Sequence, residues 1–222
     1  MKEWLLLKFE NPIALVGGGW VDWHLLEQLV ERGYALVAAD GAINELVARG
    51  FLPDAVIGDM DSIADDLDLP SSVVKVALPE QSTTDFEKCL YSTESSFYVG
   101  LGFLGRRLDH SLASLSVLAK YTQLKKVVLV DEVDLIFGAS GEFSIAMPVS
   151  ARFSIFPLSE CHFTASEGLA YPLNDLTLKI GALVGTSNKT IAESVRVFPA
   201  PNSDPYAVLL AKEHLSSLIA AC

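Results

Sequence analysis

The sequence predicts an α/β domain with a mainly parallel sheet, followed by an all-β domain. As far as about residue 131, short apolar runs alternate with segments of helical periodicity, which is typical of βαβ units. After that residue come short runs, several of which alternate apolar with polar residues, and clusters of Gly, Pro, Ser and Asn separate them. We therefore expect one domain at 1–131 and a second at 132–222.

The helical segments of the first half begin and end at recognisable residues. Asp22 is placed to cap a first helix, which Gly33 ends. A second helix ends at Gly50, a third begins at Thr84, and a fourth begins at Asp109. The runs expected to be strands are Ile13–Val16, Ala35–Ala39, Ala55–Ile57, Val73–Ala77, Phe97–Leu101 and Lys126–Val130.

The second half contains five short runs at spacings of about ten to twenty residues, which favours an antiparallel sandwich or barrel. Two polar segments, Gly168–Leu173 and Gly185–Thr190, are expected to be loops between strands. The tail 207–222 is expected to form a strand and then a short amphipathic helix, and we assign it no role. The five runs are Val133–Phe137, Phe143–Met147, Arg152–Phe156, Leu176–Ile180 and Val195–Phe198.

Composition and charge exclude several classes of protein. The formal net charge is −12 and no cluster of Lys or Arg exceeds two neighbours, so we expect no nucleic-acid partner. Apolar runs are too short to span a membrane, and the first residues do not resemble a secretory signal, so we expect a cytoplasmic protein without membrane association. The three cysteines are widely separated, which indicates reduced thiols.

Aspartates follow most of the strands predicted in the first half. Because the carboxyl ends of parallel strands meet at one edge of a sheet, we expect these carboxylates to converge there. Converging carboxylates repel one another unless a cation neutralises them, and Mg²⁺ prefers such oxygen ligands together with substrate phosphates. The pattern predicts metal-assisted phosphate chemistry. The segments concerned are Ala39–Asn44, Gly58–Ser62, Thr84–Lys88 and Arg106–His110.

Each of these segments also has an interpretation that needs no ligand. Asp59 and Asp61 suit an ordinary polar turn. Thr84 and Glu87 form the pattern of a capping box, in which Thr84 accepts from the third helical amide. Asp109 suits the N-cap of the fourth helix. Taken one at a time, the segments do not decide between a purely structural role and a functional one.

Taken together, the motifs resemble the thiamine pyrophosphokinase family in order and approximate spacing. That family reads A-D-G-G-A-N, P-D, G-D-x-D-S, Q-x-x-T-D-x-x-K, G-x-R-x-D-H, G-L-x-[YW]-x-L and S-N. The sequence departs from the pattern at Ala42, where a second Gly is frequent, and at Lys189, where an acidic residue is common. The matching segments are 39–44, 53–54, 58–62, 81–88, 105–110, 168–173 and 187–188.

The resemblance implies a Rossmann-like α/β nucleotide domain, a β-sandwich that binds thiamine, and a homodimer with each active site shared between subunits. It implies that the pyrophosphoryl group of ATP passes to the thiamine hydroxyl, with Mg²⁺, to give thiamine diphosphate and AMP. Two alternatives stay open. One is a pterin pyrophosphokinase, and the other is a non-catalytic regulator that binds nucleotide or thiamine.

The resemblance also implies roles for individual residues. Lys88 and Arg107 are expected to neutralise phosphate oxygens, and Asp109 to orient the thiamine hydroxyl or accept its proton. Tyr171 is expected to stack on the aminopyrimidine. The expected magnesium ligands are Asp59, Asp61 and Asp85. The expected nucleotide-binding residues are Asp40, Gly41, Asn44, Gln81 and Thr84. The expected thiamine-binding residues are Tyr171, Thr186, Ser187 and Asn188.

Overall fold

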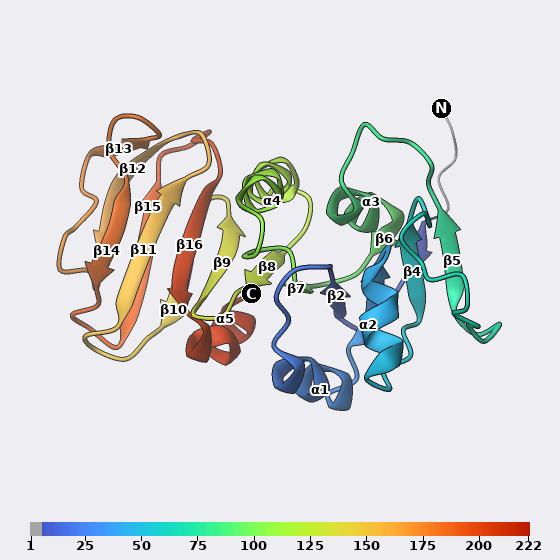
Figure 1. Ribbon diagram of the computed structural model, residues 1–222. Helices are drawn as coiled ribbons and strands as arrows, with labels where there is room; N and C mark the ends of the chain where they lie inside the picture. The colour runs from blue at the N-terminus through green and yellow to red at the C-terminus, as the bar shows by residue number, and fades with distance from the viewer. Residues whose placement is uncertain (1–5) are drawn as a thin grey trace. The chain divides into compact units, whose positions relative to one another are not determined.

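The computed structural model describes residues 6–222, which form two compact units (Figure 1). The first unit runs as far as Val117 and also contains Leu129–Glu132. The second unit contains Leu118–Val128 and Val133–Cys222. The chain therefore passes between the units within a helix, α4 (Leu108–Tyr121), and within a strand, β8 (Val127–Val130).

Five strands of the first unit lie parallel in the order β7-β2-β3-β4-β5. All residues of β2, β4 and β7 are buried, as expected for strands covered on both faces, whereas β5 buries only Val76. Each of these strands lies where the sequence predicts one. Their bounds are β2 Ile13–Val16, β3 Ala35–Ala39, β4 Ala55–Gly58, β5 Val74–Ala77 and β7 Tyr98–Leu101.

Helices α1 and α3 begin at the predicted caps, whereas α4 does not. Asp22 accepts a hydrogen bond from the amide of Leu25 (3.1 Å) at the start of α1, and Thr84 accepts one from the amide of Glu87 (3.3 Å) at the start of α3. Asp109 lies in the first turn of α4 and not ahead of it, because the helix begins one residue earlier. The remaining bounds are α1 Trp23–Glu31, α2 Ala42–Ala48 and α3 Asp85–Ser92, with a short parallel pair formed by β1 Leu7–Lys8 and β6 Thr93–Glu94.

All strand pairs of the second unit that the structure describes are antiparallel, in the orders β9-β16-β11-β14 and β10-β15-β12-β13 (Figure 1). Phe163 of β12 meets Tyr206 of β16 edge-on, with ring centroids 5.1 Å apart, so the two groups of strands share an aromatic contact. The bounds are β9 Asp134–Ala139, β10 Phe143–Ala146, β11 Arg152–Pro157, β12 Glu160–Glu167, β13 Leu176–Lys179, β14 Gly185–Lys189, β15 Ser194–Pro199 and β16 Tyr206–Ala211.

Two strands of the second unit lie where the sequence predicts none. Residues 185–189, expected to be a loop, form β14, which pairs with β11 across an irregular register. Only Asn188 of this strand is buried, so the apolar alternation that marks a strand is missing. Likewise β12 buries only Cys161 and Phe163 among eight residues. Backbone pairing to a neighbouring strand, and not side-chain burial, defines both elements.

The tail forms the predicted strand and helix. After β16 comes a 3₁₀ turn, Lys212–His214, and then α5 (Leu215–Ala221), which packs beside β10 and buries Leu215 and Leu218. Among the described residues no helix is both long and apolar enough to cross a membrane.

Two glycines of the second unit provide a test of backbone geometry. Gly168 and Gly181 both have φ near +80°, where a side chain costs about 1–2 kcal/mol. A Cβ on Gly168 would also overlap the carbonyl oxygen of Ser194, whereas one on Gly181 would meet nothing within 4 Å. We expect Gly168→Ala to lower the free energy of unfolding by about 1–3 kcal/mol more than Gly181→Ala does. Urea unfolding measures both, and equal losses would contradict the clash.

Candidate active site

The carboxyl ends of four parallel strands in the first unit open into a cavity of about 790 Å³. Segments that follow β2, β3, β4 and β7 line it, together with the starts of α3 and α4, as the sequence predicts for the carboxyl edge of such strands. Every lining residue belongs to the first unit. The predicted site residues that line it are Asp40, Gly41, Asp59, Gln81, Thr84, Asp85, Lys88, Arg107 and Asp109.

Three carboxylates form a group with the geometry of a cation site. Asp40, Asp59 and Asp61 each present an oxygen within 4.8 Å of the others. Asp40 is buried, Asp59 is half-buried and Asp61 is exposed. Hard oxygen donors at this spacing fit Mg²⁺, which one or two carboxylates commonly hold together with substrate phosphates. The structure thus places Asp40, expected beside the nucleotide, among the candidate metal ligands.

The backbone holds Asp40 in an uncommon conformation. Its φ is +45°, and the amide of Met60 (φ +70°) donates to Asp40 Oδ1 at 2.9 Å. A Cβ on Gly58 would come 2.5 Å from the Cβ of Asp40, so only glycine at that position leaves room for the aspartate. Residues at positive φ persist where the surrounding structure holds them, and they are frequent at functional sites.

Lys88 supplies a buried positive charge between two of the predicted aspartates. Its side chain is 2% exposed, and Nζ lies 3.1 Å from Asp85 Oδ1 and 4.0 Å from Asp59 Oδ2. Burial raises the pKa of Asp85, and the Lys88 ammonium opposes that effect. The pKa of Asp59 is lowered, chiefly by the hydrogen bond that Gln81 Nε2 donates to Asp59 Oδ2 at 2.6 Å.

Arg107 and Asp109 neutralise each other at the rim of the cavity. Nη2 and Nε of Arg107 donate to the two oxygens of Asp109 at 2.6 and 3.1 Å, and both side chains are 65% exposed. The pair lowers the pKa of Asp109 and raises that of Arg107, so both groups are ionised at neutral pH. Because exposed pairs contribute only about 0–1 kcal/mol, a phosphate group can displace the carboxylate from the arginine.

Asn44 and Asp61 are predicted site residues that do not line the cavity. The side chain of Asn44 donates to the carbonyl of Ser62 (2.8 Å) and accepts from the amide of Ala64 (3.0 Å). Asn44 therefore holds the loop that carries Asp61. Asp61 accepts a hydrogen bond from the hydroxyl of Ser62 at 2.9 Å. Its carboxylate lies beside those of Asp40 and Asp59, which do line the cavity.

Sequence reasoning missed part of the cavity wall. Gly17 and Gly19 follow β2, and a Cβ on either would come within 2.7 Å of the carbonyl oxygen of Gly102. Arg106, at φ +49°, donates to the carbonyl of Gly18 at 3.3 Å. These glycines follow a predicted strand but lack the spacing of a phosphate-binding loop, which favours an ordinary turn in the sequence; the structure places them in the cavity wall.

The predicted thiamine-binding residues lie in the second unit, on β14 and the loop before β13. Asn188 accepts from the amide of Tyr171 at 3.0 Å and donates to its carbonyl at 2.6 Å, so the asparagine clamps the backbone of Tyr171. The Tyr171 side chain remains 70% exposed. Thr186 and Ser187 are exposed on β14, with Ser187 at φ +60°.

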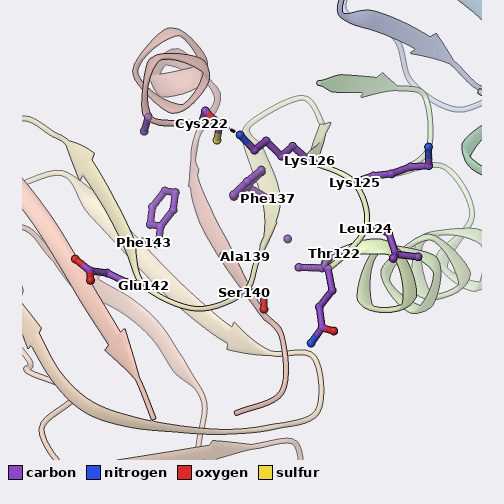
Figure 2. A pocket seen from close by; sticks show the side chains of 13 residues that line it. Thr122, Leu124, Lys125, Lys126, Phe137, Ala139, Ser140, Glu142, Phe143 and Cys222 are labelled. Atoms are coloured by element: carbon purple, nitrogen blue, oxygen red, sulfur yellow. Dashed lines mark hydrogen bonds between the residues drawn. The ribbon is translucent and has the colours of Figure 1, made fainter. Parts of the chain in front are cut away.

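A second cavity, of about 620 Å³, lies within the second unit and contains no predicted site residue (Figure 2). Phe137 and Phe143 form part of its wall, with ring centroids 5.8 Å apart. Lys126 also lines it and donates to the carbonyl of Cys222, as the dashed line in Figure 2 shows. No titratable cluster like that of the first cavity is described here, so the first cavity is the candidate active site.

The clamp on Tyr171 leads to a stability prediction. Removing the side chain of buried Asn188 leaves the amide and carbonyl of Tyr171 without these partners. We expect Asn188→Ala to lower the free energy of unfolding by about 1–3 kcal/mol. The neighbouring exposed Thr186→Ala serves as the control and should change it by less than about 0.5 kcal/mol. Urea unfolding of both variants measures the difference. Equal free energies of unfolding for Asn188→Ala and Thr186→Ala would show that the two hydrogen bonds to Tyr171 contribute nothing to stability.

Both halves of the chain match models of one family. Residues 26–130 match the model described as "Thiamin pyrophosphokinase, catalytic domain". Residues 145–198 match "Thiamin pyrophosphokinase, vitamin B1 binding domain". The resemblance inferred from the motifs is thereby confirmed.

Curated relatives and solved structures agree with these matches. A Caenorhabditis elegans protein named thiamin pyrophosphokinase 1 is 30% identical over 187 residues, covering 76% of each chain. A rice thiamine pyrophosphokinase 1 is 28% identical over 203 residues, also covering 76% of each. The structure of thiamin pyrophosphokinase from Candida albicans matches with a TM-score of 0.76 and 16% identity, covering 94% of this chain and 93% of that one. The Bacillus subtilis enzyme matches at 0.71 and 21%, covering 90% and 99%.

Proposed function

The chain belongs to the thiamine pyrophosphokinase family, and we propose that it transfers the pyrophosphoryl group of ATP to the hydroxyl of thiamine, giving thiamine diphosphate and AMP. The observation that carries the proposal is the family match over both halves of the chain. The group of Asp40, Asp59 and Asp61, with buried Lys88, lies at the carboxyl ends of the parallel strands and supports it. The cytoplasmic location expected from the sequence stays a prediction.

Two domains with separate tasks follow from this proposal. The domain expected at 1–131 binds the nucleotide as a Rossmann-like fold, and the one expected at 132–222 binds thiamine as a β-sandwich; the compact units differ from these bounds in grouping Leu118–Val128 with the second. Parallel strands in the first unit and antiparallel strands in the second support the division.

Mg²⁺ fits the acidic end of the cavity. We assign it to Asp59 and Asp61, with Asp85 from the family pattern and Asp40 from its place beside the other two. When bound, the ion supplies neutralising charge to the phosphate oxygens. The hydrogen bond from Gln81 lowers the pKa of Asp59, which favours the ionised form that binds a cation.

The phosphates and the nucleophile are positioned by the protein's own charges. Lys88 faces the carboxylates as a fixed cation, and the start of α3 at Thr84 presents backbone amides to an anion. As phosphate oxygens reach the rim, Arg107 turns from Asp109 to bind them bidentately. The released carboxylate of Asp109 then orients the thiamine hydroxyl for in-line attack on the β-phosphorus, and positioning of this kind supplies most of the rate enhancement.

The remaining predicted residues either contact the ligands or hold the contacting residues in place. Gly41, Gln81 and Thr84 follow the nucleotide and phosphate track, and Asn44 holds the adjoining loop. In the second unit Tyr171 stacks on the aminopyrimidine with its exposed ring, while Thr186 and Ser187 present hydroxyls to the edge of the ring. Asn188 acts chiefly by fixing Tyr171.

Purified protein with ATP, Mg²⁺ and thiamine should form thiamine diphosphate and AMP in equal amounts. Chromatographic separation of both products tests this. A pterin pyrophosphokinase would leave thiamine unchanged and convert a hydroxymethyl pterin, and a binding protein without catalysis would release no AMP. The family matches favour thiamine over both alternatives.

The metal assignment predicts the effect of removing single charges. Asp59→Asn and Asp61→Asn should each abolish turnover while the fold persists, because each removes a ligand from a crowded acidic group. Relief of repulsion should leave the melting temperature equal or slightly raised. The exposed Asp66→Asn serves as the control. Full activity of both site variants at saturating Mg²⁺ would contradict the assignment.

The assignment of Tyr171 predicts a selective loss. Tyr171→Ala should weaken thiamine binding by about 1–3 kcal/mol, the size of an aromatic stacking contact, and leave ATP binding unchanged. Tyr171→Phe keeps the ring and should bind thiamine nearly as the wild type does. Titration calorimetry with each ligand measures both effects. A similar loss for thiamine and ATP would assign Tyr171 a structural role.

We further propose that the chain forms a C₂ homodimer in which each site combines the nucleotide domain of one subunit with the sandwich of the other. The division of the motifs between the two halves of the chain supports sharing of this kind. Mixing Asp59→Asn with a variant in which Tyr171 and Asn188 are both Ala should restore part of the activity, because exchange creates heterodimers with one intact site. Activity measured after mixing decides, and no recovery would mean that each chain builds its own site.

A further inference from the structure

Glu80 is the centre of a dense set of hydrogen bonds beside the site. Its Oε2 accepts from the amide and hydroxyl of Ser82 (2.8 and 2.5 Å) and from the amide of Thr83 (3.2 Å). Its Oε1 accepts from the hydroxyl of Thr83 and from the phenol of Tyr91 (3.0 Å). Five donors from three residues therefore converge on one carboxylate, which the sequence motifs did not single out.

These donors keep Glu80 charged and fix the loop after it. The hydroxyls of Ser82 and Thr83, in that order, lower the pKa of Glu80 to about 2, so the carboxylate is ionised throughout the neutral range. Residues 81–84 belong to no helix or strand, and the bonds to Glu80 hold their backbone in place. Tyr91, in the last turn of α3, ties the same carboxylate to that helix.

The loop that Glu80 holds carries the partner of a candidate metal ligand. Gln81, the next residue, donates from Nε2 to Asp59 Oδ2 at 2.6 Å, and this bond is the main cause of the lowered pKa of Asp59. The loop ends at Thr84, which caps α3 and precedes Asp85. Glu80 therefore holds the backbone directly after Gln81, the residue that contacts Asp59.

Glu80 itself is poorly suited to bind a cation or substrate. Both of its oxygens already accept from hydroxyl or amide donors, and it is absent from the lining of the cavity. Its effect on the site passes through the loop that it holds, in which Gln81 contacts Asp59 and Thr83 lines the cavity. Partners that orient a ligating carboxylate commonly alter metal affinity or activity by about 10–100-fold when they are removed.

We propose that Glu80 is a positioning residue that, through Gln81, holds the carboxylate of Asp59 in the orientation required to bind a divalent cation. The metal-binding part of this inference stands on the geometry, and only its consequence for turnover rests on the proposed function.

The direct test measures metal binding without substrate. Mn²⁺, which prefers the same hard oxygen donors as Mg²⁺, is titrated into the full chain and followed by electron paramagnetic resonance. We expect Glu80→Ala and Gln81→Ala each to weaken Mn²⁺ binding by about 10–100-fold. Tyr91→Phe removes one of the five donors and should weaken it less. The control Glu31→Ala, on the exposed end of α1, should bind as the wild type does.

A double variant separates positioning from general stability. If Glu80 acts through Gln81, then Glu80→Ala combined with Gln81→Ala should bind Mn²⁺ no more weakly than either single variant. Hydrogen exchange at the amides of Ser82 and Thr83 should accelerate in Glu80→Ala and Tyr91→Phe but not in Gln81→Ala. Additive losses in the double variant, or a lowered melting temperature with unchanged Mn²⁺ affinity, would overturn the proposal.

Turnover provides the second readout. The Mg²⁺ concentration that gives half-maximal AMP formation should rise in Glu80→Ala and Gln81→Ala in parallel with the loss of Mn²⁺ affinity. If Glu80→Ala does not fold, unchanged Mn²⁺ binding in Gln81→Ala overturns the proposal by itself. Absence of AMP formation by the wild type would instead end the proposed function, while the Mn²⁺ titration would still decide the role of Glu80.

Discussion

Repulsion between carboxylates at the carboxyl ends of the parallel strands in the first unit is the constraint on which the site depends. Asp40, Asp59 and Asp61 present oxygens within 4.8 Å of one another. At such distances two unit charges repel by about 3–4 kcal/mol at an effective dielectric constant of about 20. The buried ammonium of Lys88 offsets part of this repulsion, and a bound cation would offset more. This acidic group is the one to which the proposed function assigns Mg²⁺.

Backbone strain accompanies the close approach of these three carboxylates. Asp40 and Met60 both lie at positive φ, and Gly58 leaves the space that the Asp40 side chain needs. Glu80 contributes from outside the group, since its five hydrogen bonds hold the loop from which Gln81 reaches Asp59. Stabilising bonds around the site therefore compensate for strain and repulsion within it.

The sequence predicts most of this architecture where local signals are strong. Buried apolar runs predict the parallel strands, and their carboxyl ends predict that the aspartates after them converge, as Asp59 and Asp85 do beside Lys88. The place of Asp40 among the candidate metal ligands was not predictable, because it follows from a positive φ and from the lack of a Cβ at Gly58. The strand β14 was missed because backbone pairing, without apolar alternation, defines it.

The net charge of −12 makes the binding of a polyanion such as ATP a question of local charge. At physiological salt the Debye length is about 8 Å, so exposed acidic residues farther away are largely screened. Within that range the cavity offers the fixed charge of Lys88 and the exchangeable charge of Arg107, which Asp109 holds until an anion competes for it. Because an exposed ion pair is worth at most about 1 kcal/mol, this exchange costs little. Phosphate oxygens that draw Arg107 away also release the carboxylate of Asp109. In the proposed mechanism, the binding of ATP thereby frees the carboxylate that we assign to orient the thiamine hydroxyl.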